Sequence, residues 1–185
     1  MRAPSTPAVR RLSHPALLFA LRFLTIVALG MAITIRFWTV FDWVSRGWAW
    51  VLALLLERTG LGPAVVSGST VFYAQAVSLQ VVLECTGLHL LTMWIGVILS
   101  FPATWGRRLG GLVVGAAVIG FANLVRLWVA AWVLLRWPAR FELVHAYIWQ
   151  AGMIVVLLGL AAWWMRAPAV PAATVGGPAP SARPA

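Results

Sequence analysis

Apolar runs of membrane length, separated by short segments that carry arginine, constrain this 185-residue chain most strongly. Each run is close to the ~20 helical residues that cross a ~30 Å hydrocarbon core. Only 10% of the residues are charged, whereas a soluble domain has about a quarter. We therefore predict an all-α polytopic membrane protein with about four transmembrane helices, an interfacial helix and a short strand-like extracytoplasmic segment. The four runs cover residues 17–40, 88–106, 109–134 and 146–165.

The net charge of +10 comes from 14 arginines and no lysine. These arginines lie between the apolar runs and form no basic stripe with base-reading residues, which argues against a nucleic-acid partner. Positive residues mark the cytoplasmic ends of membrane helices. Four spans place all three arginine groups inside: the one near the N-terminus, Arg107 with Arg108, and Arg166.

The segment 41–84 is expected outside the membrane. Residues 43–58 carry aromatic and charged anchors typical of an interfacial helix, and the apolar run at 48–56 is too short to cross. A glycine-containing connection then leads to an alternating stretch, 71–82, that resembles β-strands.

The remaining organisation is simple. Residues 1–16 form a basic cytoplasmic arm, 17–166 the membrane-embedded domain, and 167–185 a disordered tail rich in Pro, Ala and Gly. The arm and the first run resemble a signal peptide, but the run is long and its cleavage site weak, so we expect a retained anchor. Gly111 and Gly115 indicate close helix packing, and Pro102 is expected to kink the second span.

Three polar residues fall at one depth when helical rise is counted from the cytoplasmic arginines. Cys85, the only cysteine, lies 22 residues before Arg107, about 33 Å away. His145 lies 21 residues before Arg166, about 31 Å, and Arg126 lies 18 residues after Arg108, about 27 Å. All three are therefore expected near the outer interface.

This set suits acyl transfer without a metal or other cofactor. A cysteine attacks more readily when a neighbouring cation stabilises its thiolate, and Arg126 would do this or hold the oxyanion of an intermediate. His145 would take the thiol proton and return it to a leaving amine. Asn123, one turn before Arg126, would orient the arginine.

Each residue also has a plainer interpretation. A lone buried cysteine is usually a small hydrophobic residue. Arg126 would then snorkel outward or pair with Glu84 or Glu142, and His145 would cap the fourth span.

Neighbouring polar residues are assigned lesser roles. His89 is a competing base, but it lies deeper and on the same helix as Cys85, whereas His14 lies in the arm, too far away. An ionised Glu84 would raise the pKa of the adjacent thiol, so we expect this side chain to point elsewhere or to bind substrate.

At these residues the chain resembles the exosortase/archaeosortase family, and most closely its compact exosortase H branch. The resemblance covers about residues 60–165, whereas the first 60 residues carry no signature of the family. It rests on four segments: Glu84-Cys85-Thr86-Gly87-Leu88, residues 101–108, Asn123-Leu124-Val125-Arg126-Leu127, and residues 141–150.

The resemblance implies a thiol protease and transpeptidase of the bacterial cytoplasmic (inner) membrane, with its active site on the extracytoplasmic side. Cys85 would be the nucleophile, Arg126 the catalytic arginine and His145 the acid and base. Glu84, Thr86, Gly87 and Asn123 would bind substrate or support the site. The implied partners are exported proteins whose C-terminal sorting signal combines a short motif, a transmembrane helix and a basic tail.

A non-enzymatic membrane protein is the rival hypothesis. It would be a small transporter, an assembly factor or a haem-binding subunit. His89 and His145 are the only pair available as haem ligands, whereas a transporter would more often show repeats or broken helices.

Overall fold

The computed structural model describes residues 14–74 and 77–166. Most of the basic arm and the whole Pro/Ala/Gly tail lie outside the described residues. The helices are α1 (His14–Arg36), α2 (Asp42–Arg58), α3 (Leu88–Ser100), α4 (Trp105–Arg136) and α5 (Trp149–Arg166). The strands are β1 (Ala64–Ser67), β2 (Thr70–Tyr73) and β3 (Val77–Gln80). Short 3-10 turns lie at Trp38–Phe41, Leu83–Cys85 and Pro138–Arg140, and a π-helix at Leu143–Ile148.

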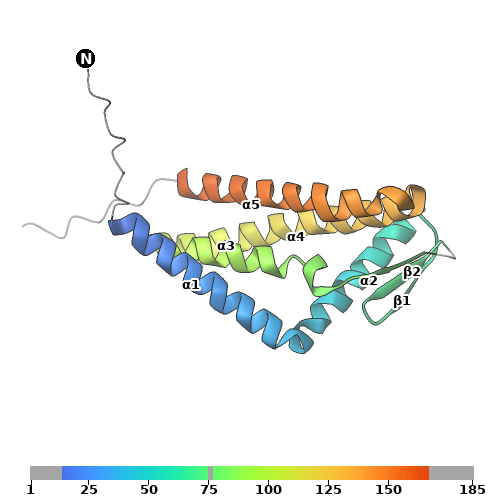
Figure 1. The fold of residues 1–185 in the computed structure, drawn as a ribbon, viewed down its shortest axis with the longest axis horizontal. Helices are drawn as coiled ribbons and strands as arrows, with labels where there is room; N and C mark the ends of the chain where they lie inside the picture. Colours follow the sequence, from blue (N-terminus) through green and yellow to red (C-terminus); the bar gives the residue numbers. More distant parts are fainter. Residues whose placement is uncertain (1–13, 75–76, 167–185) are drawn as a thin grey trace, which may run out of the picture.

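Helices α1, α3, α4 and α5 form an elongated bundle (Figure 1). The beginnings of α1 and α4 and the ends of α3 and α5 lie at one end of it, which carries Arg107, Arg108 and Arg166. Helix α2 and the sheet lie toward the opposite end. The segments predicted as four spans therefore do lie alongside one another, with these arginines at one end.

Four helical segments are long and apolar enough to cross a membrane, but they are not the four that the sequence predicted. They are Ala16–Arg36, Trp38–Arg58, Trp105–Arg136 and Pro138–Arg166. The second qualifies because the 3-10 turn Trp38–Phe41 continues into α2, giving 21 residues, although its mean hydropathy of 1.2 is the lowest of the four. The run 48–56, which we judged too short to cross, is therefore part of a helical segment that is long enough by length and composition.

The predicted span 88–106 was wrong in its length. Helix α3 has 13 residues, about 20 Å, and ends at Ser100. Phe101 is extended (ψ 136°), as expected for a residue before proline, which is disfavoured in the helical region. Pro102 therefore terminates this helix instead of kinking it.

The three-stranded antiparallel sheet has the order β1-β2-β3 and packs on α2 and α4. β2 and β3 confirm the strands predicted within 71–82, whereas β1 had not been singled out. The Tyr73 hydroxyl donates a 2.7 Å hydrogen bond to the Ala131 carbonyl of α4, and burial raises the pKa of Tyr73 to about 12. This bond fixes the sheet against α4.

The small residues of α4 serve close packing, as predicted, and they face tryptophans. Gly111 lies against the ring of Trp164, and Gly115 against the ring of Trp94. The Trp94 indole donates a 3.1 Å hydrogen bond to the Gly111 carbonyl. A methyl group at either glycine would overlap an indole ring, so these positions set how closely α3 and α5 approach α4.

Candidate functional site

Cys85 ends the 3-10 turn that connects β3 to α3, and it is 5% exposed. Its N–H donates to the Val82 carbonyl (2.9 Å). The Thr86 hydroxyl donates to the Leu83 carbonyl (2.6 Å) and accepts from the Leu88 N–H (3.3 Å). Thr86 thus holds the turn that presents the thiol.

Gly87 lets the chain pass from this turn into α3. Its φ of +77° lies in the left-handed region, which side chains other than glycine adopt at a cost. A Cβ at this position would lie 3.5 Å from Cγ of Asn123. This distance is ordinary van der Waals contact, so it is the backbone angle that favours glycine immediately after Cys85 and Thr86.

The structure brings Cys85 and His145 together. Sγ of Cys85 lies 3.7 Å from Nε2 of His145, although the two residues are 60 positions apart. His145 belongs to the π-helix that precedes α5. Its ring stacks on Phe141 with a centroid distance of 5.1 Å and an angle of 9° between the ring planes. This stacking fixes the orientation of the imidazole, which lines the same cavity as the thiol.

Helix α4 supplies two more side chains to the turn. The Asn123 amide donates a 2.9 Å hydrogen bond to the Cys85 carbonyl. Nη1 of Arg126 donates to the Glu84 carbonyl (3.3 Å). Asn123 is fully buried and Arg126 is 5% exposed. Residues from α4, the π-helix and the turn therefore meet at one level, where counting along the helices had placed three of them.

Arg126 neither snorkels nor forms an ion pair within residues 14–74 and 77–166. Within these residues its hydrogen bond goes to the Glu84 backbone, not to the carboxylate of Glu84 or Glu142. Its buried Nε–H has no acceptor in the described part of the chain. Leaving such a group unpaired is costly, so this nitrogen is suited to an anionic or oxyanionic ligand.

Burial has the largest effect on the pKa of the Cys85 thiol. It raises the pKa of Cys85, while the Arg126 charge and the backbone hydrogen bond lower that pKa and Glu84 raises it. The expected effects of Arg126 and Glu84 thus hold in sign, but the net shift is upward. The resting thiol is protonated at neutral pH, so its attack needs a base, and His145 is in contact with it.

The thiol opens into a cavity of about 390 Å³. One wall is β3 with the residues after it, and the other is formed by α4 and the start of the π-helix region. It is lined by Ser78, Leu79, Gln80, Val82, Cys85, Leu127, Leu134, Phe141 and His145.

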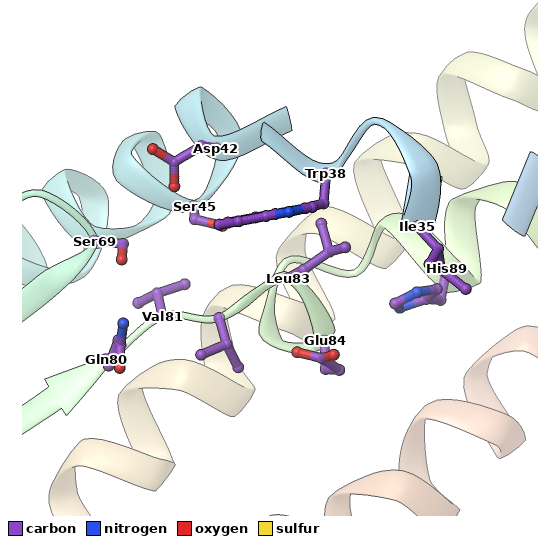
Figure 2. Close-up of a pocket in the computed structure, with 11 residues that line it drawn as sticks. Ile35, Trp38, Asp42, Ser45, Ser69, Gln80, Val81, Leu83, Glu84 and His89 are labelled. Atoms are coloured by element: carbon purple, nitrogen blue, oxygen red, sulfur yellow. The ribbon is translucent and has the colours of Figure 1, made fainter. Parts of the chain in front are cut away.

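Two further cavities flank the same turn. One, of about 410 Å³, lies beside Arg126 between the ends of α1, α3 and α5, and Glu84 and His89 also line it. The other, of about 550 Å³, lies between α2 and the turn. Figure 2 shows Glu84 and His89 on one side of this larger cavity, and Trp38 and Asp42 on the other. Glu84 is thus directed away from the thiol cavity, as expected.

His89 does not share the cavity of the thiol. It lines the two flanking cavities, neither of which includes His145. The competing base and the proposed haem pair therefore both lack support from the geometry. His14 begins α1 at the arginine-bearing end of the bundle, far from Cys85.

Two features of the site lie within the segment 141–150 but were not predicted individually from the sequence. The stacking partner Phe141 is one of them, and the π-helix around His145 is the other. π-helical turns occur frequently at functional sites, but no residue pattern in Leu143–Ile148 distinguishes one from an ordinary helix. Phe141, by contrast, could have been identified from the sequence, because it is an aromatic residue four positions before His145.

Comparisons with protein-family models, with curated proteins and with solved structures found no match for this chain. The resemblance to exosortases remains a prediction, and the site rests on its own geometry.

Proposed function

We propose that this protein is a membrane-embedded cysteine peptidase or transpeptidase of the exosortase type. The observation that carries the proposal is the 3.7 Å contact between Cys85 Sγ and His145 Nε2. A buried arginine with an unpaired N–H lies beside the same turn. A nucleophile within reach of a base, next to a fixed cation, is the arrangement that covalent acyl transfer requires.

The reaction proceeds in two steps, formation of a thioester on Cys85 and its cleavage by water or an amine. His145 Nε2 takes the thiol proton as Sγ attacks the scissile carbonyl carbon, and the negative oxygen of the tetrahedral intermediate is stabilised by Arg126. The C–N bond then breaks, the leaving nitrogen receives the proton from His145, and a thioester remains on Cys85. Water or an amine next gives a proton to His145 and attacks the thioester carbonyl carbon. The C–S bond then breaks, the new acid or amide leaves, and His145 returns the proton to Sγ, which regenerates the thiol.

The shape of the bundle favours a substrate anchored in the same membrane. With the Arg107, Arg108 and Arg166 end inside, the turn that carries Cys85 lies toward the outer side, and α2 with the sheet rests at the outer interface. The site would then be reached by the peptide just outside a substrate's transmembrane helix. Exported proteins with a C-terminal motif, helix and basic tail meet this requirement.

The cavity of about 410 Å³ beside Arg126, referred to below as the slot, supports this substrate class. Three of the five methionines in the chain line it: Met31, Met93 and Met153. Methionine surfaces adapt to apolar partners of different shape. An apolar substrate helix placed in this slot would bring its outer end to the turn without a strict requirement on its side chains.

The proposal is tested by the C-termini of exported proteins in the source organism. Strains that carry the wild-type protein or Cys85→Ala in its place are compared by mass spectrometry of C-terminal peptides. We expect a group of exported proteins to lose a hydrophobic, basic C-terminal segment in the wild type and to retain it in the variant. Equal processing in the two strains, with equal amounts of the protein in membranes, would exclude Cys85 as the nucleophile.

A further inference from the structure

Strand β3 is an edge strand, and its outward backbone groups have no hydrogen-bond partner among residues 14–74 and 77–166. Val81 N–H bonds to the Ser69 carbonyl (2.8 Å), and the register continues as Gln80 with Thr70 and Leu79 with Val71. Hydrogen-bonded and non-bonded pairs alternate along antiparallel strands. The N–H and C=O groups of Ser78 and Gln80 therefore point away from β2.

The free edge of β3 borders the cavity of the thiol. Ser78, Leu79 and Gln80 line that cavity together with Cys85 and His145. The side chains of Ser78 and Gln80 are exposed, so they do not close the edge. Gln80 lies at the end of β3, from which the chain runs on toward Glu84 (Figure 2). An unpaired edge thus leads directly to the nucleophile.

The opposite edge of the sheet, on β1, is partly capped by a side chain of α2. By the same alternation, the N–H groups of Ala64 and Val66 in β1 point outward. The Ala64 N–H donates to Oε1 of Glu57 on α2 (3.4 Å). Exposed edges are usually covered or paired in this way. A cavity of about 350 Å³ also borders β1, but neither Cys85 nor His145 lines it. The edge beside Cys85 differs because its cavity contains the nucleophile and the histidine.

We propose that the substrate peptide binds as an added fourth strand on β3, a mode known for other peptide-binding proteins. This inference rests on the proposed function, which also sets the direction. A substrate chain running from the outer side toward the membrane runs parallel to β3. In a parallel pair, one substrate residue donates its N–H to the Ser78 carbonyl and accepts the Gln80 N–H at its own carbonyl. Recognition is then mainly through the backbone.

The first test uses peptide probes on the full chain in lipid nanodiscs. The probe is acetylated trialanine chloromethyl ketone, which alkylates Cys85, and three further probes each carry one N-methylated amide. We expect at least one methylated probe to alkylate Cys85 about tenfold more slowly, the effect of losing about one hydrogen bond. Iodoacetamide, which has no peptide to pair with β3, measures the reactivity of the thiol itself.

The second test changes the edge of β3. Gln80→Pro removes an outward N–H, and proline is tolerated at edge positions. We expect the trialanine probe to react about tenfold more slowly with this variant, with iodoacetamide unchanged. Val66→Pro removes an outward N–H at the opposite edge and is the matched control, which is expected to react like the wild type.

The outcomes separate this inference from the proposed function. Equal rates for all four probes, or no alkylation by them of a thiol that iodoacetamide labels, would overturn strand addition and leave the cysteine peptidase standing. Because the probe comparison uses the unaltered protein, it decides the question even where Gln80→Pro disturbs the sheet. Normal processing by Cys85→Ala would instead overturn the function itself.

Discussion

The side-chain amide of Asn123 donates a 2.9 Å hydrogen bond to the main-chain carbonyl of Cys85, 38 residues earlier in the chain. Asn123 is fully buried in α4. The bond therefore ties the turn that carries the thiol to the longest helix of the bundle, and the position of Sγ relative to His145 depends on it.

Removing this hydrogen bond should reduce the activity of the site more than the stability of the fold. Asn123→Leu keeps a similar volume but leaves the Cys85 carbonyl without its donor, a loss of about 1–3 kcal/mol. We expect at least tenfold slower substrate processing and a lower melting temperature. Ser100→Ala is the control, because it removes a buried hydroxyl that has no hydrogen-bond partner within the residues that the structure describes. It should leave the processing rate and the melting temperature unchanged. Unaltered processing by Asn123→Leu would show that the amide does not position the thiol.

A methyl group after the turn should displace the nucleophile without removing a reactive group. Gly87→Ala forces alanine into the left-handed region, which costs on the order of 1 kcal/mol or more. We expect processing to fall severalfold while the protein still inserts into membranes. Gly110→Ala, which meets open space in α4, should be neutral or slightly stabilising. Processing rates of the two variants are compared at equal membrane content.

The rate of thiol alkylation should depend on pH in a defined direction. Burial raises the pKa of Cys85, so the rate with iodoacetamide should increase with pH up to a midpoint above that of an ordinary thiol. The Arg126 charge lowers this pKa. Arg126→Met should therefore move the midpoint to still higher pH, whereas Arg126→Lys, which keeps a charge, should move it less. A midpoint shifted to lower pH in Arg126→Met would contradict the assigned electrostatics.

The packing of α4 against tryptophan gives a prediction about stability alone. Gly115→Ala places a methyl group in the indole of Trp94, and overpacking of this kind costs about 1–3 kcal/mol. We expect a lower melting temperature in detergent. Gly159→Ala on α5, where a Cβ meets nothing within 4 Å, should not lower it. Equal melting temperatures would mean that the interface between α3 and α4 relaxes around the methyl group.

Much of the site could be predicted because helical rise fixes depth. Counting from Arg107, Arg108 and Arg166 placed Cys85, Arg126 and His145 at one level, and the three residues do meet around one turn although α3 is shorter than the count assumed. The end of α3 was missed because the run 88–106 was treated as one helix in spite of Pro102. The length of Trp38–Arg58 was missed because the 3-10 turn before α2 has no periodic pattern.

Other features depend on tertiary structure and leave no sequence signal. The free edge of β3 follows from strand order and register, which a stretch of alternating residues does not determine. The net rise in the pKa of Cys85 likewise follows from burial under α4 and the π-helix, since the neighbouring charges alone did not indicate which effect dominates.

The pairing of Cys85 with His145 is tested most directly by alkylation of the thiol in His145→Gln. Purified wild-type protein and variant are treated with iodoacetamide near pH 7, and the adduct at Cys85 is followed by mass spectrometry, with melting temperatures as the check on folding. If His145 is the base, the variant reacts at least tenfold more slowly at an unchanged melting temperature. Equal rates in two folded proteins would show that His145 does not activate Cys85.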